Sequence, residues 1–168
     1  MSVSTPGVET PLAESWITNR IRNDATLAGL GTHASYPEFV ADVGERVYQW
    51  VAPEETPSPY IILSQQGATD LVPLGGTRIW AQLDYLLVVV ASLSEWAPIS
   101  PIADRLDALF HVEGALGAAG VIAAADGIQA GRVHETRRVR PFALPEVVAG
   151  KQYRRLGGIY RLRVSAGS

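Results

Sequence analysis

The side chains that most often perform catalysis or bind metals are sparse in this sequence. It contains no cysteine, which excludes disulfides, thiolate nucleophiles and cysteine-ligated metals. Its three histidines, His33, His111 and His134, lie far apart and have no acidic neighbour at ligand spacing. Such histidines are more typical of surface or half-buried positions than of a zinc or iron site. We therefore predict neither a metal nor a cofactor.

Acidic pairs and glycine motifs give no stronger indication of catalysis. Glu54 and Glu55 lie in a proline-rich stretch, and Asp104 and Asp107 lie on the polar face of an expected helix, where paired carboxylates are usually just solvated. The glycine pairs at 75–76 and 157–158 fit turns or strand kinks, and no nucleophile elbow, phosphate loop or dinucleotide fingerprint is present. The sequence predicts no catalytic residues and a protein that is not an enzyme.

Charge is divided unevenly along the chain. Residues 1–131 hold five basic and fifteen acidic residues, a net charge of −10, whereas residues 132–168 hold nine basic and two acidic residues, a net charge of +7. A basic segment on an acidic body can contact nucleic acid, meet the acidic face of a neighbouring subunit, or simply be solvated. We favour docking over DNA binding, because a chain with a pI near 5.6 repels a polyanion nearly everywhere. The candidate interface residues are Arg137, Arg138, Arg154 and Arg155.

Two stretches have the spacing of amphipathic helices. Leu12, Trp16, Ile17 and Ile21 recur at helical intervals between residues 12 and 23, and Asp24 can cap a further turn. Ser100 and Pro101 form a helix start, followed by an apolar stripe that comprises Ile102, Ala103, Leu106, Leu109 and Phe110. Both helices are expected to pack their apolar faces on a sheet.

The expected strands are rich in β-branched and aromatic residues and lie between turn formers. They cover residues 44–50, 60–64, 77–92, 127–142 and 151–164. In the third, one face is apolar throughout, while the other changes from polar at Gln82 and Asp84 to apolar at Leu86, Val88 and Val90. This pattern predicts a strand that is solvated on one side in its first half and buried on both sides in its second.

The order of helix, strands, helix and strands, with short links between strands, favours antiparallel pairing. We therefore predict an α+β fold with a mostly antiparallel sheet and two amphipathic helices packed on one face. Residues 12–168 form a single domain in this prediction, and residues 1–11, with Pro6 and Pro11, form a flexible N-terminal segment. Residues 114–125 are interpreted as a connection and residues 141–150 as a loop. No apolar run approaches the roughly 20 residues of a membrane-spanning helix, so no membrane contact is expected.

Five segments, taken in order, resemble the tail-completion or tail-terminator proteins of long-tailed, siphovirus-like bacteriophages. They are WITNRIRNDATLAGL, GERVYQWVAPEETPSPYIIL, TRIWAQLDYLLVVVA, PIADRLDALF and YRRLGGIYRLRVSA. The resemblance covers about residues 12–165, and its most characteristic part is the strand Arg46–Trp50 followed by an extended proline-containing link into PSPYIIL. It is a pattern of elements, so no single functional residue can be carried over.

The resemblance implies a structural virion protein that assembles as a homo-oligomer, a hexameric ring, in the host cytoplasm. Such a ring ends tail-tube growth and joins the tail to the head, with a tail-tube protein and a head-completion protein as partners and DNA passing through the ring. Its location would be the head–tail junction of the virion. The alternatives are another head–tail connector or tail-tube ring protein, or a small-molecule-binding or enzymatic α+β domain.

Overall fold

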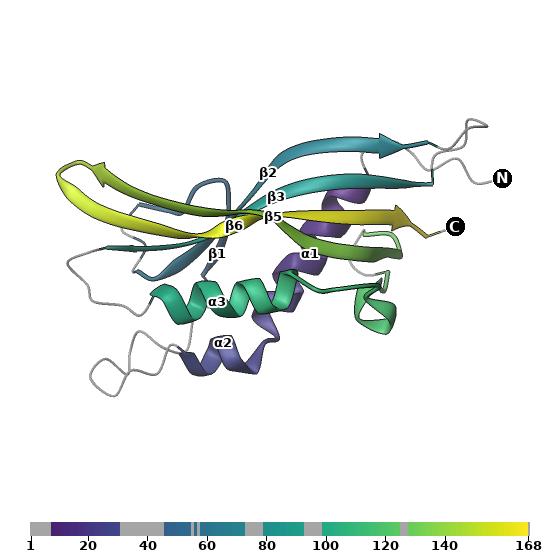
Figure 1. Ribbon diagram of the computed structural model, residues 1–168, viewed down its shortest axis with the longest axis horizontal. Coiled ribbons are helices and arrows are strands. Elements are labelled where there is room, and N and C mark those ends of the chain that lie inside the picture. Colours follow the sequence, from purple (N-terminus) through teal and green to yellow (C-terminus); the bar gives the residue numbers. More distant parts are fainter. Residues whose placement is uncertain are drawn as a thin grey trace.

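The computed structural model describes residues 8–30, 46–54, 56, 58–72, 79–92, 99–124 and 128–167. Within these residues, three helices and one 3-10 turn accompany six strands; Figure 1 shows their arrangement. In chain order the elements are α1 (Glu9–Arg22), α2 (Ala25–Leu30), β1 (Val47–Gln49), β2 (Tyr60–Leu71), β3 (Trp80–Ser92), α3 (Ile99–Phe110), the 3-10 turn η2 (Gly117–Gly120), β4 (Val121–Ile122), β5 (Gly131–Val148) and β6 (Lys151–Ala166).

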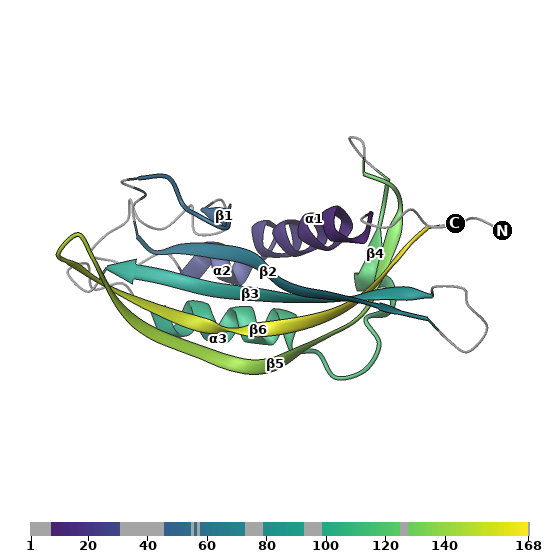
Figure 2. The same ribbon diagram turned by 90° about the horizontal axis from the view of Figure 1, so that it is seen from above.

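The six strands form one sheet in the order β1-β2-β3-β6-β5-β4, and the sheet curls into a half-barrel (Figures 1 and 2). β1 runs parallel to β2, and every other neighbouring pair is antiparallel. β5 and β6 pair from Gly131 opposite Ala166 to Val148 opposite Lys151. This long hairpin forms one side of the molecule.

The predicted fold class, an α+β fold with a mostly antiparallel sheet and two amphipathic helices packed on one face, is wrong. The structure is mostly β, with about half of the described residues in strands, and its sheet is mixed. The sheet is mixed because the chain between Gln49 and Tyr60 returns to the end where β1 began, whereas we expected a short link to reverse its direction. The β content is higher because β2 and β5 continue well beyond the predicted strands.

One face of the sheet carries the main core. Its alternating β3 side chains, from Ala81 to Ala91, pack with buried side chains of α1 and α3 in a single hydrophobic cluster. Trp16 of α1 meets Phe110 of α3 edge to face, with ring centroids 5.8 Å apart. The Trp16 indole N–H also donates to the carbonyl of Ala119 at 2.9 Å, which ties η2 to α1.

The opposite face of β3 is divided as its sequence predicts. Gln82 and Asp84 are only half-buried, whereas Val88 and Val90 are buried in a second, smaller cluster with Ile62. Partly buried Tyr60, Leu86, Phe142 and Tyr153 surround that cluster. The prediction of a strand buried on both sides in its second half is confirmed. Because no helix among the described residues packs on it, we call this side of the sheet the open face.

Several boundaries differ from the predictions. α1 begins at Glu9, so the last three residues of the segment expected to be flexible are helical. The stretch at 114–125, interpreted as a connection, contains η2 and β4. The loop predicted at 141–150 is absent, because β5 continues to Val148 and only Ala149 and Gly150 form a turn. Some of the predicted features lie outside the described residues. They are residues 1–7, the strand starts predicted at 44–45 and 77–78, Glu55, and the glycines at 75–76.

Gly157 allows the central strands to approach closely. A Cβ built at this position would lie 2.1 Å from the Leu87 carbonyl oxygen and 2.9 Å from the Val88 Cα. Backbone atoms cannot give way as a flexible side chain does, so only glycine fits here. The glycine pair at 157–158 lies inside β6 and not in a turn, which was one of the two interpretations of its sequence; the other was a strand kink.

Candidate assembly surface

The basic C-terminal strands β5 and β6 lie toward one edge of the half-barrel, and only the end of their hairpin extends beyond β3. The segment from His111 to Ile122 contacts the outer edge of β5 only as far as Arg138: Val112 and Leu116 donate to the carbonyls of Thr136 and His134, and the Arg138 N–H donates to His111 Nδ1. On the other side, β3 ends at Ser92, opposite Tyr153. We call residues 141–156 of the hairpin the arm. Its β6 strand stays paired with β3 as far as Tyr153, so only residues 147–152 extend beyond β3, and its end passes the start of α3 in both views (Figures 1 and 2).

A two-residue turn closes the arm. Ala149 and Gly150 both have positive φ, 50° and 79°, and they join strands that pair up to Val148 and Lys151. This is the geometry of a type I′ hairpin turn, whose twist matches that of the flanking strands. Gly150 adopts it without strain, whereas Ala149 does so at a cost.

The outer edge of the arm carries two prolines. Pro141 and Pro145 pair with Gly158 and Arg154, and the pairing between β5 and β6 is continuous from Arg140 to Val148. Positions four apart in a strand have the same orientation, and a proline nitrogen that faced β6 would interrupt the ladder. Both nitrogens therefore face outward, so this edge lacks two of its hydrogen-bond donors.

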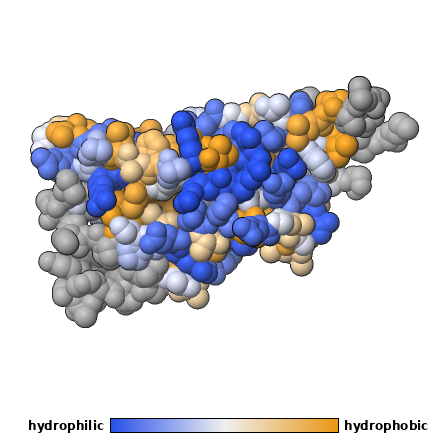
Figure 3. Space-filling model, viewed as in Figure 1, coloured by the Kyte–Doolittle hydropathy of each residue, from blue (hydrophilic) through white to orange (hydrophobic). Residues whose placement is uncertain are grey.

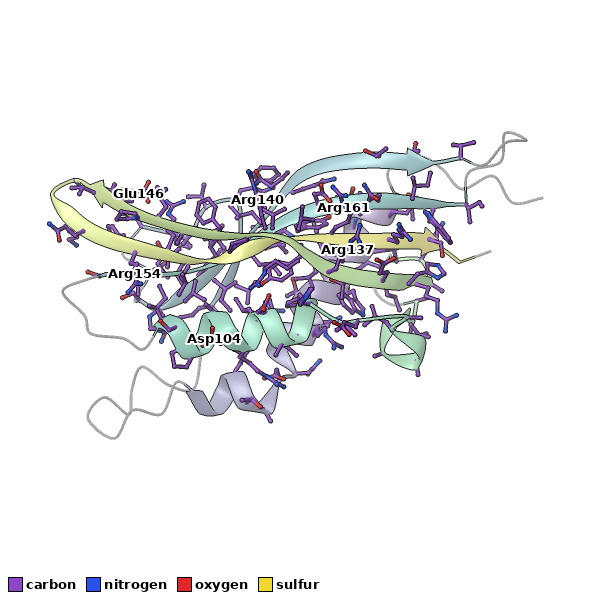
Figure 4. The ribbon with its side chains drawn as sticks, in the orientation of Figure 1. Asp104, Arg137, Arg140, Glu146, Arg154 and Arg161 are labelled. Carbon is purple, nitrogen blue, oxygen red and sulfur yellow. The ribbon has the colours of Figure 1, made fainter. Side chains whose placement is uncertain are left out.

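The structure separates the four predicted interface arginines. Arg137 and Arg138 lie near the middle of β5, whereas Arg154 and Arg155 lie in the arm. Figure 4 labels one residue of each pair, Arg137 and Arg154. Two of the four are bound within their own chain: Arg138 pairs with Asp107 of α3 at 2.9 Å, and Arg155 pairs with Glu146 across the arm. Arg137 is half exposed and approaches Glu135 only at 3.8 Å. Arg154 is exposed and forms no ion pair or hydrogen bond within the described part of the chain.

Two further arginines, Arg161 and Arg163, lie on the open face and are also neutralised internally. Arg161 donates two hydrogen bonds to the Asp84 carboxylate, at 2.8 and 2.9 Å, and this contact raises the pKa of the guanidinium. Arg163 pairs with Glu135 at 2.9 Å and lies over the Trp80 ring. The +7 charge of the C-terminal segment is therefore a poor measure of the charge available to a partner. The cations of the arm region that remain without a partner among the described residues are Arg140, Lys151 and Arg154.

The two histidines that the structure describes, His111 and His134, form contacts within the fold. His111 accepts from the Arg138 backbone, and His134 Nε2 lies 2.8 Å from the Ser165 hydroxyl beside the Trp80 ring. Burial lowers the pKa of the His134 imidazole, and the charge of Arg132 lowers it further. His33 lies outside the described residues. Among the residues that are described, no group of three or more histidines and carboxylates could hold a metal ion, and no helix is long and apolar enough to span a membrane.

Exposed apolar side chains gather at the two ends of the long axis (Figure 3). At the end of the arm they are Leu144, Val147 and Val148, of which Val147 is 68% exposed. At the opposite end they are Val72 and Ile79, which follow β2 and precede β3. Sequence reasoning missed the arm because it interpreted PFALPEVV as a loop. The signal was available, since two prolines four residues apart suit one side of an edge strand.

Trp50 is a further exposed residue that the sequence did not single out. It has a φ of 66°, and the Val51 N–H donates to the Gln49 carbonyl at 2.7 Å, which closes a γ-turn around it. A positive φ is strained for a bulky side chain, and this one is 59% exposed. Exposed tryptophan is the residue type most enriched among contacts that anchor protein partners. The sequence pattern indicated only the end of a strand here.

The sequence matches no protein-family model, and no curated protein matches it. Several solved chains are similar in structure, and two of them are described below. One belongs to the virion of a native gene transfer agent particle: it aligns with a TM-score of 0.64 over 97% of this chain and 100% of its own length, at 21% identity. The other aligns over 70% of this chain and 78% of its own, at 17% identity, and its TM-score of 0.39 is too low to indicate a shared fold. Over nearly its whole length, the chain therefore shares its fold with a chain of that virion.

Proposed function

We propose that this protein is a structural component of a phage-like virion that forms the terminator ring of the tail. The observation that supports this most strongly is the fold it shares, end to end, with a chain from a gene transfer agent virion. The resemblance of its sequence segments to tail-terminator proteins favours the position at the end of the tail tube. In this role the protein stops tube growth, joins the tail to the head and performs no catalysis.

The shape and surface of the subunit support assembly into a ring. A closed ring needs two different, complementary surfaces on each subunit, because every contact repeats head to tail. This subunit is elongated, with an arm at one end and the end of β2 and the start of β3 at the other (Figure 1). Both ends present exposed apolar side chains. We propose a homo-hexamer that contacts a tail-tube protein on one side and a head-completion protein on the other, with DNA passing through its centre.

The purified protein tests the ring. Native mass spectrometry and negative-stain electron microscopy should find closed rings whose mass is a small multiple of the 18.0 kDa subunit. A protein that stays monomeric at all concentrations, and is also monomeric when recovered from particles, would contradict the ring.

Immunogold labelling of particles from the virus that encodes the chain tests the position. The terminator predicts label at the head–tail junction only. Label along the whole tail would indicate a tube protein instead, and label inside the neck of emptied heads would indicate a connector. Particles that carry no label, with the protein detected only outside them, would exclude a virion role altogether.

A further inference from the structure

Trp50 and Arg140 lie at the same level on the two edges of the sheet. One row of paired residues crosses five strands, and it consists of Gln49, Leu63, Leu87, Gly158 and Pro141. The next row consists of Ser64, Leu86, Ile159 and Arg140. Trp50 follows Gln49, and its N–H donates to the Leu63 carbonyl at 2.9 Å, so it lies at the β1 end of this second row. Strands β2, β3 and β6 separate Trp50 from Arg140 within one chain.

Both edges resist the addition of another strand. At this level β1 and β5 are the outermost described strands, because β4 pairs with β5 only at Gly131 and Arg132. β1 is three residues long and ends in the γ-turn around Trp50, and a short edge strand offers few groups for pairing. The Pro141 nitrogen faces outward from β5 and has no hydrogen to donate. Contact at either edge must therefore come mainly from side chains.

The exposed side chains of the two edges are complementary. Trp50 is 59% exposed and makes no ring contact with the described part of the chain. Arg140, which Figure 4 labels, is exposed and forms no ion pair or hydrogen bond there. A guanidinium over the face of an indole is attracted by the ring. Pro141, beside Arg140, is also exposed and adds apolar surface.

The chain uses the same pairing of arginine with tryptophan internally. Arg20 lies 5.2 Å from the centroid of the Trp16 ring, and Arg163 lies 5.9 Å from that of Trp80. Of the three tryptophans that the structure describes, only Trp50 has no arginine over its ring. An exposed tryptophan in this position has the character of an anchor for a partner.

A second copy of the chain supplies the missing partner of each residue. When two copies lie side by side, the β1 edge of one meets the β5 edge of the next, and Trp50 then faces Arg140. This contact leaves one free Trp50 and one free Arg140, so it is heterologous and closes into a ring where the rotation allows. Two β5 edges that met each other would instead place Arg140 against Arg140, which like charge disfavours.

We propose that Trp50 of one copy packs on Arg140 and Pro141 of the next copy. This inference rests on the ring proposed above and assigns its subunit contact. The contact is repeated at every interface, so each copy contributes its tryptophan on one side and its arginine on the other.

A double-mutant cycle tests the pairing. Trp50→Ala should raise the dissociation constant of the contact by about 30-fold or more, as expected for a central anchor. Arg140→Ala should raise it by about two- to fivefold in the wild-type background. It should add almost nothing in the Trp50→Ala background, because its partner is already gone. Sedimentation velocity over a range of concentrations measures each constant. Independent, additive losses would overturn the pairing.

The matched control is Val121→Ala. Val121 is 56% exposed, and it lies on β4, away from both edges of the proposed contact. Its substitution should leave the dissociation constant unchanged. A loss of assembly equal to that of Trp50→Ala would show that the effect is not specific to the contact.

Cross-linking tests the contact with Trp50 and Arg140 both intact. The chain contains no cysteine, so Val51→Cys and Val139→Cys together place one thiol beside each residue. These two valines are 76 and 46% exposed. A short bismaleimide should join position 51 of one copy to position 139 of the next and give a ladder in multiples of the 18.0 kDa subunit. Each single variant should give no ladder, and neither should Val51→Cys with Val121→Cys.

The outcomes separate the contact from the ring. Rings of the double-cysteine variant that form but give no ladder would overturn the proposed contact, whether or not Trp50→Ala folds. A ladder from Val51→Cys alone would show that like edges meet, which also overturns it. A wild-type protein that never forms rings would instead contradict the proposed function.

Discussion

The carboxylate of Asp24 connects three elements. It accepts the Leu27 N–H at 2.8 Å at the start of α2 and two hydrogen bonds from Arg105 of α3, at 3.1 and 2.6 Å. The Arg105 guanidinium holds the pKa of this carboxyl below its usual value, and the Leu27 N–H adds to that effect. A carboxyl with a lowered folded pKa stabilises the protein above its unfolded pKa, about 3.9, and that stabilisation is lost as pH falls through the folded pKa.

We expect Asp24→Asn to lower the free energy of unfolding by about 1 to 3 kcal/mol at neutral pH, because it removes the charged partner of Arg105. The difference from wild type should shrink once pH falls below about 4, where the wild-type carboxyl also becomes neutral. Urea denaturation between pH 2.5 and 7 measures it. A difference that stays constant over this range would mean that the charge of Asp24 contributes nothing.

Arg154 and Arg155 are neighbours with different roles. Arg155 binds Glu146 within its own arm, so Arg155→Glu would place two carboxylates together and should lower stability by about 1 kcal/mol. Arg154 has no partner among the described residues, so Arg154→Glu should change stability by less than about 0.5 kcal/mol. It should nevertheless weaken ring assembly.

Denaturation midpoints measure the effect of each substitution on stability. The fraction of protein in rings, measured at several salt concentrations, gives its effect on assembly. The deficit of Arg154→Glu should shrink with salt, because the Debye length falls from about 10 Å at 0.1 M to about 3 Å at 1 M. Equal losses of stability for both variants would show that Arg154 also has a structural partner.

At the scale of the element, the two residues in the turn of the arm are not the pair that best fits its type I′ geometry. Ala149 has a φ of 50°, which asparagine and glycine adopt more readily, and Asn-Gly is the preferred type I′ pair. Ala149→Asn should therefore stabilise the fold by about 0.5 to 1 kcal/mol, and Gly150→Ala should destabilise it by about 1 kcal/mol. No neighbouring atom lies within 4 Å of a Cβ built at Gly150, so a loss there would reflect backbone conformation alone. Thermal denaturation measures both; an unchanged Gly150→Ala melting point would exclude the strained turn.

Elements with a strong local period could be predicted from the sequence, and those defined by distant partners could not. The apolar stripe from Ile102 to Phe110 and the two-sided pattern of β3 are properties of neighbouring residues, and both are present in the structure. The parallel pairing of β1 depends on where the chain re-enters the sheet at Tyr60, which no local pattern records. The arm was misread because prolines usually interrupt strands, and only pairing with β6 shows that Pro141 and Pro145 lie at an edge.

The candidate assembly surface could also be predicted only in part, because some of its features are local to the sequence and others depend on distant partners. The basic character of the C-terminal strands is visible in the sequence, but the partners Asp107, Glu146 and Asp84 lie 9 to 77 residues away from the arginines that they bind. The sequence thus identifies the strands that carry charge. Only the fold shows which of those charges are already neutralised.

At the scale of the whole molecule, the subunit combines an internally neutralised centre with two apolar ends. The centre of the open face holds the Asp84–Arg161 and Glu135–Arg163 pairs, which need no partner. The ends hold exposed apolar side chains, namely Leu144, Val147 and Val148 in the arm and Val72 and Ile79 beside the end of β2 and the start of β3.

The two prolines of the arm also affect whether single copies of the chain aggregate through this edge strand. A long, exposed edge strand is a template on which identical chains stack, and the resulting cross-β fibrils are extremely stable. Pro141 and Pro145 interrupt that template where valine and leucine side chains are also exposed. With both prolines replaced by threonine, concentrated subunits should form fibrils that bind thioflavin T, while the wild-type protein remains soluble under the same conditions. If the threonine variant stays equally soluble, some other feature protects this edge. If the threonine variant does form fibrils, the two prolines are what keeps single copies of the wild-type protein from forming amyloid.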